Sequence, residues 1–362
     1  MHLCIIGAGP AAAYFIRECM ARCSKTTFDI FEITRETLGN LRKGVAPDQI
    51  HIRKTIPGLE RVFTDSRINL IKGADITKIM KVSEIEKKYD AVIIATGAEP
   101  RRLSGIPGCE HVLNASDIMR SISANEKILA NGKIAVVGNG NVSLDVARVL
   151  LHGRSMNHPS LSEVSVDSVD LIGRNSPEHS KFTNPVLSEF LSYPIMVIIT
   201  EKVKNWIKKT ITPESSRTLK RKAFLLLSNQ APAHKSAKFI FNEVPVSIQK
   251  YNPNDSNMPS LWTSNNIPQN VHNLTDNAVK YKLTTRDSVS GVEAVRVYDR
   301  IISAIGYTRI NPDISDMLRD ISIPVYRIGW ASTDGTGTLA DAYTTAINTV
   351  SKILPYNMSG IE

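Results

Sequence analysis

The sequence predicts an α/β protein with two doubly wound, Rossmann-like domains. The first observation is a pattern of apolar strand, Gly-x-Gly turn and helix start, which occurs at residues 3–20 and again at residues 133–148. The second observation is a length of 362 residues, which is enough for two domains that each bury a core. Repeated units of this kind build parallel sheets with helices packed on their faces.

The first turn lies within residues 3–12, which read Leu-Cys-Ile-Ile-Gly-Ala-Gly-Pro-Ala-Ala. Gly7 permits a tight turn, Gly9 lets the backbone approach a pyrophosphate, and Ala12 lets the helix pack close to the sheet. Pro10 and Ala11 open the helix, whose first N–H groups face the anion. We therefore assign Gly7, Gly9, Pro10, Ala11 and Ala12 to cofactor binding.

An acidic residue follows at the spacing that a dinucleotide site requires. Residues 28–31 form a second apolar run, and Glu32 ends it about 20 residues beyond the glycines, where an acid binds a ribose hydroxyl. This context favours a dinucleotide over the alternative, a glycine turn that only joins a strand to a helix.

The second turn has the form Gly-x-Gly-x-x-Ser and opens another helix. Two such turns in one chain indicate FAD together with a nicotinamide nucleotide, whereas one would suit a simple dehydrogenase. Residues 89–98 between them form a buried strand that ends in Ala-Thr-Gly, where small residues let the backbone lie against a cofactor. The cofactor-binding residues assigned here are Thr96, Gly97, Gly138, Asn139, Gly140, Asn141 and Val142.

The end of the strand at residues 169–174 predicts which nicotinamide nucleotide binds. An acid at this place would repel a 2′-phosphate, whereas an arginine accepts one. The strand ends in Arg174, followed by Asn175, so the sequence favours NADPH.

The net charge of +9 favours an acidic partner, which could be nucleic acid, an anionic membrane or an acidic protein. The alternative is a surface that lysines merely make soluble. No apolar run approaches the roughly 20 residues of a membrane helix. The four cysteines have no metal-ligand spacing, and we expect neither a metal site nor disulfides.

A basic run at residues 217–222 precedes three leucines. Arg217 and Arg221 are four residues apart and share one face of a predicted helix. The run lacks interleaved aromatic residues, so nucleic acid is disfavoured, and the remaining choices are an acidic protein or a solvated helix face.

Residues 38–49 contain two glycines and a proline, which predicts a shaped loop rather than a regular element. The sequence Leu-Gly-x-Leu-Arg-x-Gly-Val-Ala-Pro-Asp at 38–48 resembles the flavin-contacting loop of adrenodoxin-type ferredoxin–NADP⁺ reductases. Residues 138–148 and the Gly-Trp at 329–330 are also similar to that family. The resemblance implies flavin contacts from Leu41, Val45, Gly329, Trp330, Gly337, Thr338 and Leu339, and it places Asp145 near the nicotinamide; we count Asp145 and Trp330 as catalytic.

The same resemblance implies how the domains are ordered along the chain. An FAD domain comprises residues 1–99 and 306–362, and an NADP domain of residues 100–305 is inserted into it. The implied activity is electron transfer from NADPH through FAD to an acidic [2Fe–2S] ferredoxin that docks on Arg217 and Arg221, in support of iron–sulfur cluster assembly. We expect a monomer that neither spans a membrane nor binds nucleic acid.

The chain departs from the family pattern at Gln49, Asn175 and residues 333–335. These changes leave open the alternative of a cofactor-binding protein that has lost turnover. A flavin monooxygenase is a second alternative. A disulfide reductase is a third, and it would need a reactive cysteine pair.

Eukaryotic members of the family that the chain resembles act in the mitochondrial matrix. The turn at Gly7 leaves no room for a cleavable presequence, so we expect a mitochondrial or relic-mitochondrial matrix, with the cytosol as the alternative.

Overall fold

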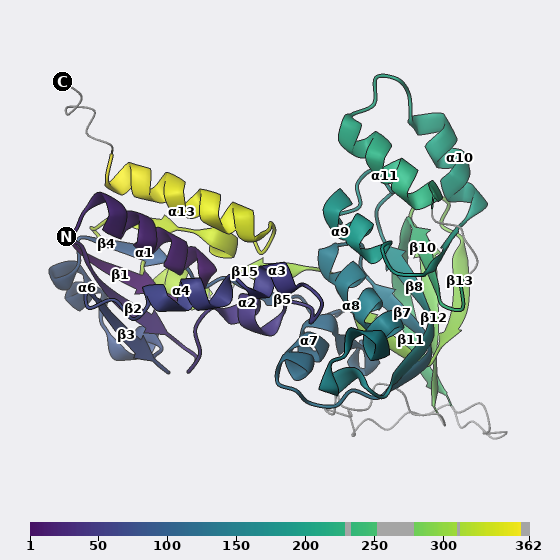
Figure 1. Cartoon of the computed structure of the whole chain (residues 1–362), viewed down its shortest axis with the longest axis horizontal. Helices are drawn as coiled ribbons and strands as arrows, with labels where there is room; N and C mark the ends of the chain where they lie inside the picture. The colour runs from purple at the N-terminus through teal and green to yellow at the C-terminus, as the bar shows by residue number, and fades with distance from the viewer. Residues whose placement is uncertain (229–232, 252–278, 310–311, 356–362) are drawn as a thin grey trace. The chain divides into compact units, whose positions relative to one another are not determined.

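The computed structural model describes residues 1–228, 233–251, 279–309 and 312–355. The chain folds into two compact units (Figure 1). Unit 1 comprises Met1–Val45, Gln49–Glu99 and Tyr307–Glu362, and unit 2 comprises Ala46–Asp48 and Pro100–Gly306. Unit 2 is therefore an insertion into unit 1, apart from the short Ala46–Asp48 segment.

Unit 1 is built on a five-stranded sheet in the order β16-β4-β1-β2-β3, with every neighbouring pair parallel. β1 lies between β4 and β2, so the strand order reverses beside it, which is where parallel sheets bind ligands. The strands are β1 (His2–Ile6), β2 (Thr27–Glu32), β3 (Ile68–Lys72), β4 (Ala91–Ile94) and β16 (Val325–Arg327).

Alternate residues of β1 face the two layers that cover this sheet. Leu3 and Ile5 pack with α1, α4 and α13, and α13 lies beside α1 (Figure 1). Cys4 and Ile6 pack with α5, α6 and α12 on the opposite face. The helices are α1 (Pro10–Arg22), α2 (Gly39–Lys43), α3 (Ile50–Arg53), α4 (Ile56–Val62), α5 (Ile76–Ile79), α6 (Val82–Lys88), α12 (Pro312–Met317) and α13 (Leu339–Ile353).

Unit 2 repeats this plan with a six-stranded parallel sheet in the order β6-β14-β7-β8-β10-β9. Its order reverses beside β7, which precedes the second glycine turn. The strands are β6 (Leu113–Asn114), β7 (Ala130–Val137), β8 (Val164–Gly173), β9 (Met196–Ile199), β10 (Ser236–Phe241) and β14 (Arg300–Ser303). A short pair, β5 (Ala98–Pro100) and β15 (Tyr307–Arg309), lies where the chain passes between the units.

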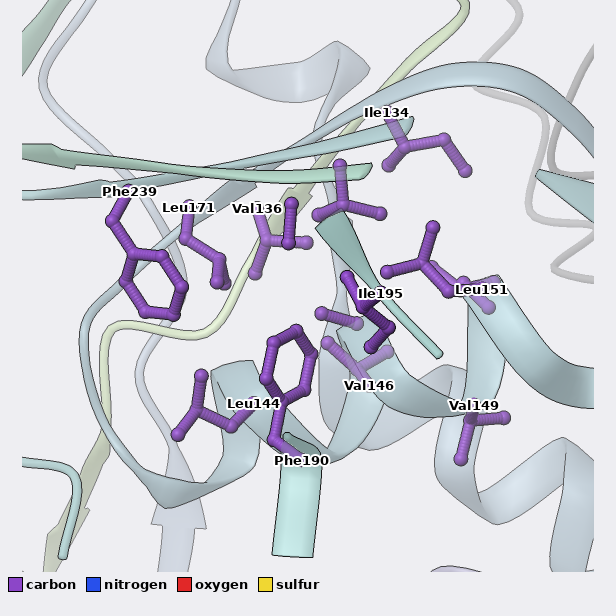
Figure 2. Close-up of a cluster of buried hydrophobic side chains, with 14 of the residues drawn as sticks. Ile134, Val136, Leu144, Val146, Val149, Leu151, Leu171, Phe190, Ile195 and Phe239 are labelled. Atoms are coloured by element: carbon purple, nitrogen blue, oxygen red, sulfur yellow. The ribbon is translucent and has the colours of Figure 1, made fainter. Parts of the chain in front are cut away.

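Helices cover one face of the unit 2 sheet. Figure 2 shows this core, in which Val136 and Phe239 of the sheet meet Leu144 and Phe190 of the helices. The helices are α7 (Ala115–Ser123), α8 (Asn141–His152), α9 (Asn184–Phe190), α10 (Glu201–Thr210) and α11 (Arg217–Ser228), with 3₁₀ turns at Cys109–His111, Gly153–Met156 and Pro159–Leu161.

An antiparallel sheet covers the other face of unit 2, where a doubly wound domain would ordinarily carry helices. It consists of β11 (Glu243–Tyr251), β12 (Lys280–Asp287) and β13 (Glu293–Tyr298). Its buried side chains Leu283 and Tyr298 pack against Ala135 and Val137 of β7. Residues of β12 and β13 alternate between buried and exposed, as a sheet with one solvated face requires.

The structure corrects one sequence prediction. Residues 38–49 were expected to lack regular structure, but Gly39–Lys43 form the short helix α2. Leu38 takes a left-handed φ of 67° and is fully buried, and the turn that it makes starts the helix. The apolar anchor at Leu38 thus outweighs Gly39 at the start of this helix and Gly44 at its C-cap.

Within the described ranges, no helix combines the length and the apolar content that a bilayer span requires. Residues 251–273 are rich in Asn, Pro and Ser, which predicts a loop, but this segment lies almost entirely outside the described residues.

Replacing Phe239 should show how strongly unit 2 depends on its aromatic core. The Phe239 ring is fully buried and meets the rings of Phe182, Phe190 and Phe241 at centroid distances of 6.0–6.1 Å. We expect Phe239→Ala to lower the free energy of unfolding by about 3–5 kcal/mol. The control Phe224→Ala, at a ring that is 58% exposed, should change it by no more than about 0.5 kcal/mol in denaturant titrations.

Candidate nucleotide-binding sites

The first glycine turn is closely packed against the end of β4. Gly7 has a φ of +99°, and a Cβ there would lie 2.6 Å from the carbonyl oxygen of Ala95. The Gly7 N–H donates to the carbonyl of Phe31 at 2.8 Å, and Gly9 is the N-cap of α1 with Pro10 at the helix start. The turn therefore directs the α1 N-terminus to the carboxyl edge of the sheet, where its N–H groups can meet a phosphate.

Glu32 lies against this turn from the end of β2. Its Oε2 accepts a hydrogen bond from the Ala8 N–H at 2.7 Å, and its Oε1 accepts from the Thr34 N–H and hydroxyl at 2.8 Å. The carboxylate is thus held in one orientation beside the glycines, as a ribose-binding acid must be.

Thr96 supplies an independent observation that fits a group bound in unit 1. Its hydroxyl is buried and finds no hydrogen-bond partner among the described residues. The Thr96 Cα would be 3.0 Å from a Cβ at Gly7, so this hydroxyl belongs to the same turn. Buried polar atoms are ordinarily satisfied, so this residue fits the contact surface of a bound group.

The C-terminal segment brings a second helix start to the same edge. A Cβ at Gly329, where φ is +61°, would lie 2.7 Å from the Cβ of Ala11. The Trp330 indole N–H donates to the Gly337 carbonyl at 3.1 Å, and the Trp330 ring lies 4.7 Å from that of Tyr307. Trp330 therefore holds the glycine-rich loop that precedes Thr338, the N-cap of α13.

The loop that follows β2 returns to this turn. The Leu38 N–H donates to the Ala8 carbonyl at 2.7 Å, which fixes α2 beside the glycines. Leu41 in α2 is buried and Val45 is half-buried, and both pack with the apolar core between the sheet and α1. The structure therefore brings together the residues that the sequence assigns to FAD.

The second glycine turn has the same construction in unit 2. Gly138 has a φ of +141°, and a Cβ there would lie 2.2 Å from the Ala304 carbonyl oxygen. Gly140 is the N-cap of α8, and Asn141 and Val142 form its first turn. The Asn139 side-chain Nδ2 is buried without a hydrogen-bond partner among the described residues, which again fits a site completed by a bound group.

Arg174 lies at the end of β8, next to this turn in the sheet. Its side chain is exposed and makes no ion pair or hydrogen bond with the part of the chain that the structure describes. The Asn175 amide instead donates to the His179 carbonyl at 3.2 Å and closes the loop that follows. An exposed guanidinium here is available to a phosphate, whereas the Asn175 side chain is occupied within its own loop.

Asp145 belongs to a buried ionic cluster around Arg148. The Arg148 side chain is fully buried; its Nε lies 2.7 Å from Asp48 Oδ2, and its Nη1 lies 3.0 Å from Asp145 Oδ1. Glu189 Oε2 is 3.7 Å from the same Nη1, and the Tyr193 hydroxyl donates to Asp48 at 2.9 Å.

Three carboxylates therefore surround one guanidinium. Burial raises the pKa of Asp145 to about 6; the Arg148 charge opposes this rise, and the Glu189 and Asp48 charges add to it. Because like charges in a buried site resist full ionisation, the cluster can hold a proton near neutral pH.

Sequence reasoning did not identify this cluster. Asp48 and Arg148 stand in the two motifs that were singled out, but their 100-residue separation hid the contact between them. The available signal was an Asp145–Arg148 pair three residues apart in an otherwise apolar helix, since a cation that is buried there needs a counter-ion.

Two parallel sheets, each with a glycine turn and a helix N-terminus at its switch point, define a two-dinucleotide-domain oxidoreductase fold. The model of the pyridine nucleotide-disulphide oxidoreductase family matches residues 1–212, and the chain belongs to this family. Such enzymes bind FAD and NADP(H).

Several curated relatives are adrenodoxin or ferredoxin reductases. A probable mitochondrial NADPH:adrenodoxin oxidoreductase of Dictyostelium discoideum is 31% identical over 212 residues, which cover 53% of this chain and 41% of the relative. The Arabidopsis thaliana mitochondrial NADPH:adrenodoxin oxidoreductase is 27% identical over 66% of this chain and 53% of the relative. The chain thus spans about half the length of these relatives, and the resemblance drawn from residues 38–48 is confirmed.

A solved structure of Mycobacterium tuberculosis FprA in complex with NADPH has the same fold. It matches with a TM-score of 0.75 over 97% of this chain and 83% of the FprA chain, at 21% sequence identity. The two-domain α/β architecture is therefore shared, and the fold class predicted from the sequence is confirmed.

The cluster around Arg148 predicts that the stability gained by removing the Asp145 charge depends on pH. A carboxyl group whose pKa is raised in the folded state destabilises the fold above that pKa, and the penalty vanishes below the unfolded value near 4. Asp145→Asn should therefore raise the free energy of unfolding by about 3 kcal/mol at pH 8 and leave it nearly unchanged at pH 4.

Thermal melts from pH 4 to pH 8 would measure this difference, with Glu178→Gln at an exposed carboxylate of unit 2 as the control. Equal destabilisation by Asp145→Asn at every pH would show that Asp145 acts as a permanently charged partner of Arg148.

Proposed function

We propose that this protein transfers electrons from NADPH through FAD to an acidic [2Fe–2S] ferredoxin. The observation that carries the proposal is the pair of glycine turns on separate parallel sheets, with Arg174 at the end of the second site. One turn suits each dinucleotide, and the relatives named for NADPH, adrenodoxin and ferredoxin support the direction of electron flow.

Unit 1 is the proposed FAD domain and unit 2 the proposed NADP domain. FAD bound in unit 1 would supply a two-electron acceptor that can release its electrons one at a time. The residues of the chain supply binding and orientation: the α1 N-terminus and Glu32 hold the first dinucleotide, and the Gly138–Gly140 turn with Arg174 holds the second. Trp330 keeps the loop before α13 in place against the flavin site.

Asp145 is the residue proposed to act beside the nicotinamide. Its carboxyl group is half-buried on α8, and its pKa of about 6 lets it hold or release a proton close to neutral pH. Hydride transfer itself needs little acid–base help, so the main contribution of these residues is to orient the reactants.

The acidic ferredoxin is proposed to dock on α11. Arg217 and Arg221 are both exposed on this helix, and α11 contains no acidic residue. The Arg221 guanidinium lies 5.4 Å from the centre of the exposed Phe224 ring, so the surface offers an apolar contact beside its positive charges.

We further propose that the protein is a monomer and that it acts in a mitochondrial or relic-mitochondrial matrix, in keeping with the mitochondrial relatives. Its proposed role there is to support iron–sulfur cluster assembly.

An anaerobic titration of the purified protein with NADPH, and separately with NADH, tests the function. The protein should carry a flavin spectrum that NADPH bleaches at a lower concentration than NADH does, because Arg174 favours the 2′-phosphate. A flavin that is bound but never bleached would support a cofactor-binding protein without turnover. A folded protein that takes up no FAD would overturn the proposal.

Charge reversal on α11 tests the docking site. The double variant Arg217→Glu, Arg221→Glu should lower the kcat/KM for a purified acidic [2Fe–2S] ferredoxin at least about tenfold at low salt, because attraction becomes repulsion. The rate with ferricyanide, which needs no protein docking, should stay the same, and the difference should shrink at high salt.

The control for this experiment carries the same charge change on unit 1. Lys25→Glu, Lys87→Glu reverses two exposed lysines of unit 1 and should leave the ferredoxin kinetics close to those of the unmodified protein. Equal ferredoxin kinetics in both double variants would remove α11 from the docking site.

A further inference from the structure

Helix α11 also buries a cation on the face opposite its exposed arginines. Lys222 is only 7% exposed, although its neighbour Arg221 is exposed. The Lys222 ammonium has no carboxylate partner in the described ranges, and the proposed function makes no use of it. Burying a lysine without a counter-ion costs free energy, so a specific arrangement must hold it there.

Neutral groups of one loop provide this arrangement. Lys222 Nζ donates to the carbonyl oxygen and to the hydroxyl of Ser180, both at 3.0 Å. The same ammonium lies 4.8 Å from the centre of the Phe182 ring. Burial lowers the pKa of Lys222, but the two acceptors and the aromatic face favour its charged form. The side chain therefore connects α11 to residues 180–182.

That loop is in turn bonded to the second glycine turn. The N–H groups of Lys181 and Phe182 donate to the Asn139 carbonyl at 2.8 and 3.1 Å. The Thr183 N–H donates to the Asn141 side-chain oxygen at 2.9 Å. One continuous set of contacts thus leads from Lys222 through Ser180 and Phe182 to the residues at the start of α8.

Arg174 stands at the other end of the same loop. Residues 174–183 leave the end of β8 and are braced internally, since Asn175 bonds to His179 and the Ser180 hydroxyl donates to the Pro177 carbonyl at 2.6 Å. The loop therefore has one end at the guanidinium proposed for the 2′-phosphate and the other on the glycine turn. Lys222 is a buried side chain that holds the loop between these two ends.

We propose that Lys222 is a positioning residue for NADPH recognition: it holds the loop of residues 174–183 so that Arg174 meets the 2′-phosphate. The inference rests on the proposed function, because it concerns the same nucleotide site. It predicts that loss of the Lys222 ammonium weakens NADP⁺ binding more than NAD⁺ binding, since NAD⁺ lacks the phosphate that Arg174 meets.

The test compares Lys222→Met with Lys209→Met in the full chain loaded with FAD. Methionine keeps much of the apolar stem and removes the ammonium, and Lys209 is an exposed lysine on the neighbouring helix α10. Calorimetric titration should show a roughly tenfold higher Kd for NADP⁺ in Lys222→Met, less than about twofold change for NAD⁺, and no change for either in Lys209→Met. The KM for NADPH should rise while the rate of flavin reduction at saturating NADPH stays the same.

A second variant guards against loss of folding. Ser180→Ala removes one of the two acceptors without adding volume, and it should shift the NADP⁺ to NAD⁺ preference in the same direction by a smaller factor. An unchanged NADP⁺ Kd in a folded Lys222→Met, or in Ser180→Ala if Lys222→Met does not fold, would overturn the inference. So would an equal loss of NADP⁺ and NAD⁺ binding, which is the signature of a purely structural lysine. Failure of the unmodified protein to bind NADP⁺ would instead overturn the proposed function.

Discussion

A parallel sheet gathers the carboxyl ends of all its strands at one edge, and both candidate sites depend on this constraint. In unit 1 it brings Gly7, Glu32, Thr96 and Gly329 together from four strands that are far apart in the sequence. The turns at this edge require glycine because their backbone lies within contact distance of the next strand. A Cβ at Gly7 or Gly138 would collide with a neighbouring carbonyl oxygen, so the sheet, the turn and the helix start form one structural unit.

The parts of the fold that the sequence predicts are those with a local signal. The glycine turns, the strand that ends in Arg174 and the helix that carries Arg217 and Arg221 all follow from residues that are adjacent in the chain. The turn at α2 was missed because it depends on Leu38 being buried by distant residues, which composition does not reveal. The antiparallel sheet of unit 2 was not predicted, because its strands alternate between a more buried and a more exposed face only when they are paired over the parallel sheet.

The candidate sites also depend on contacts between residues far apart in the sequence, which no local pattern predicts. Arg148 meets Asp48 across 100 residues, and Lys222 meets Ser180 across 42. Two of the buried cations of unit 2 are therefore held in opposite ways: Arg148 lies beside three carboxylates, whereas Lys222 has only neutral acceptors among the described residues. The carboxylates around Arg148 make the number of protons on the cluster sensitive to pH near neutrality. The neutral acceptors around Lys222 hold a loop without any ionisable partner.

The insertion of one unit into the other has a consequence for the order in which the chain can fold during synthesis. The glycine turn at Gly7 is translated first, but β16, Gly329 and α13, which complete its surroundings, are translated only after the whole of unit 2. All strands of the unit 2 sheet are available by Ser303, whereas the sheet of unit 1 still lacks its edge strand at that stage. The ribosome therefore completes the candidate site of unit 2 before that of unit 1, although unit 1 begins the sequence.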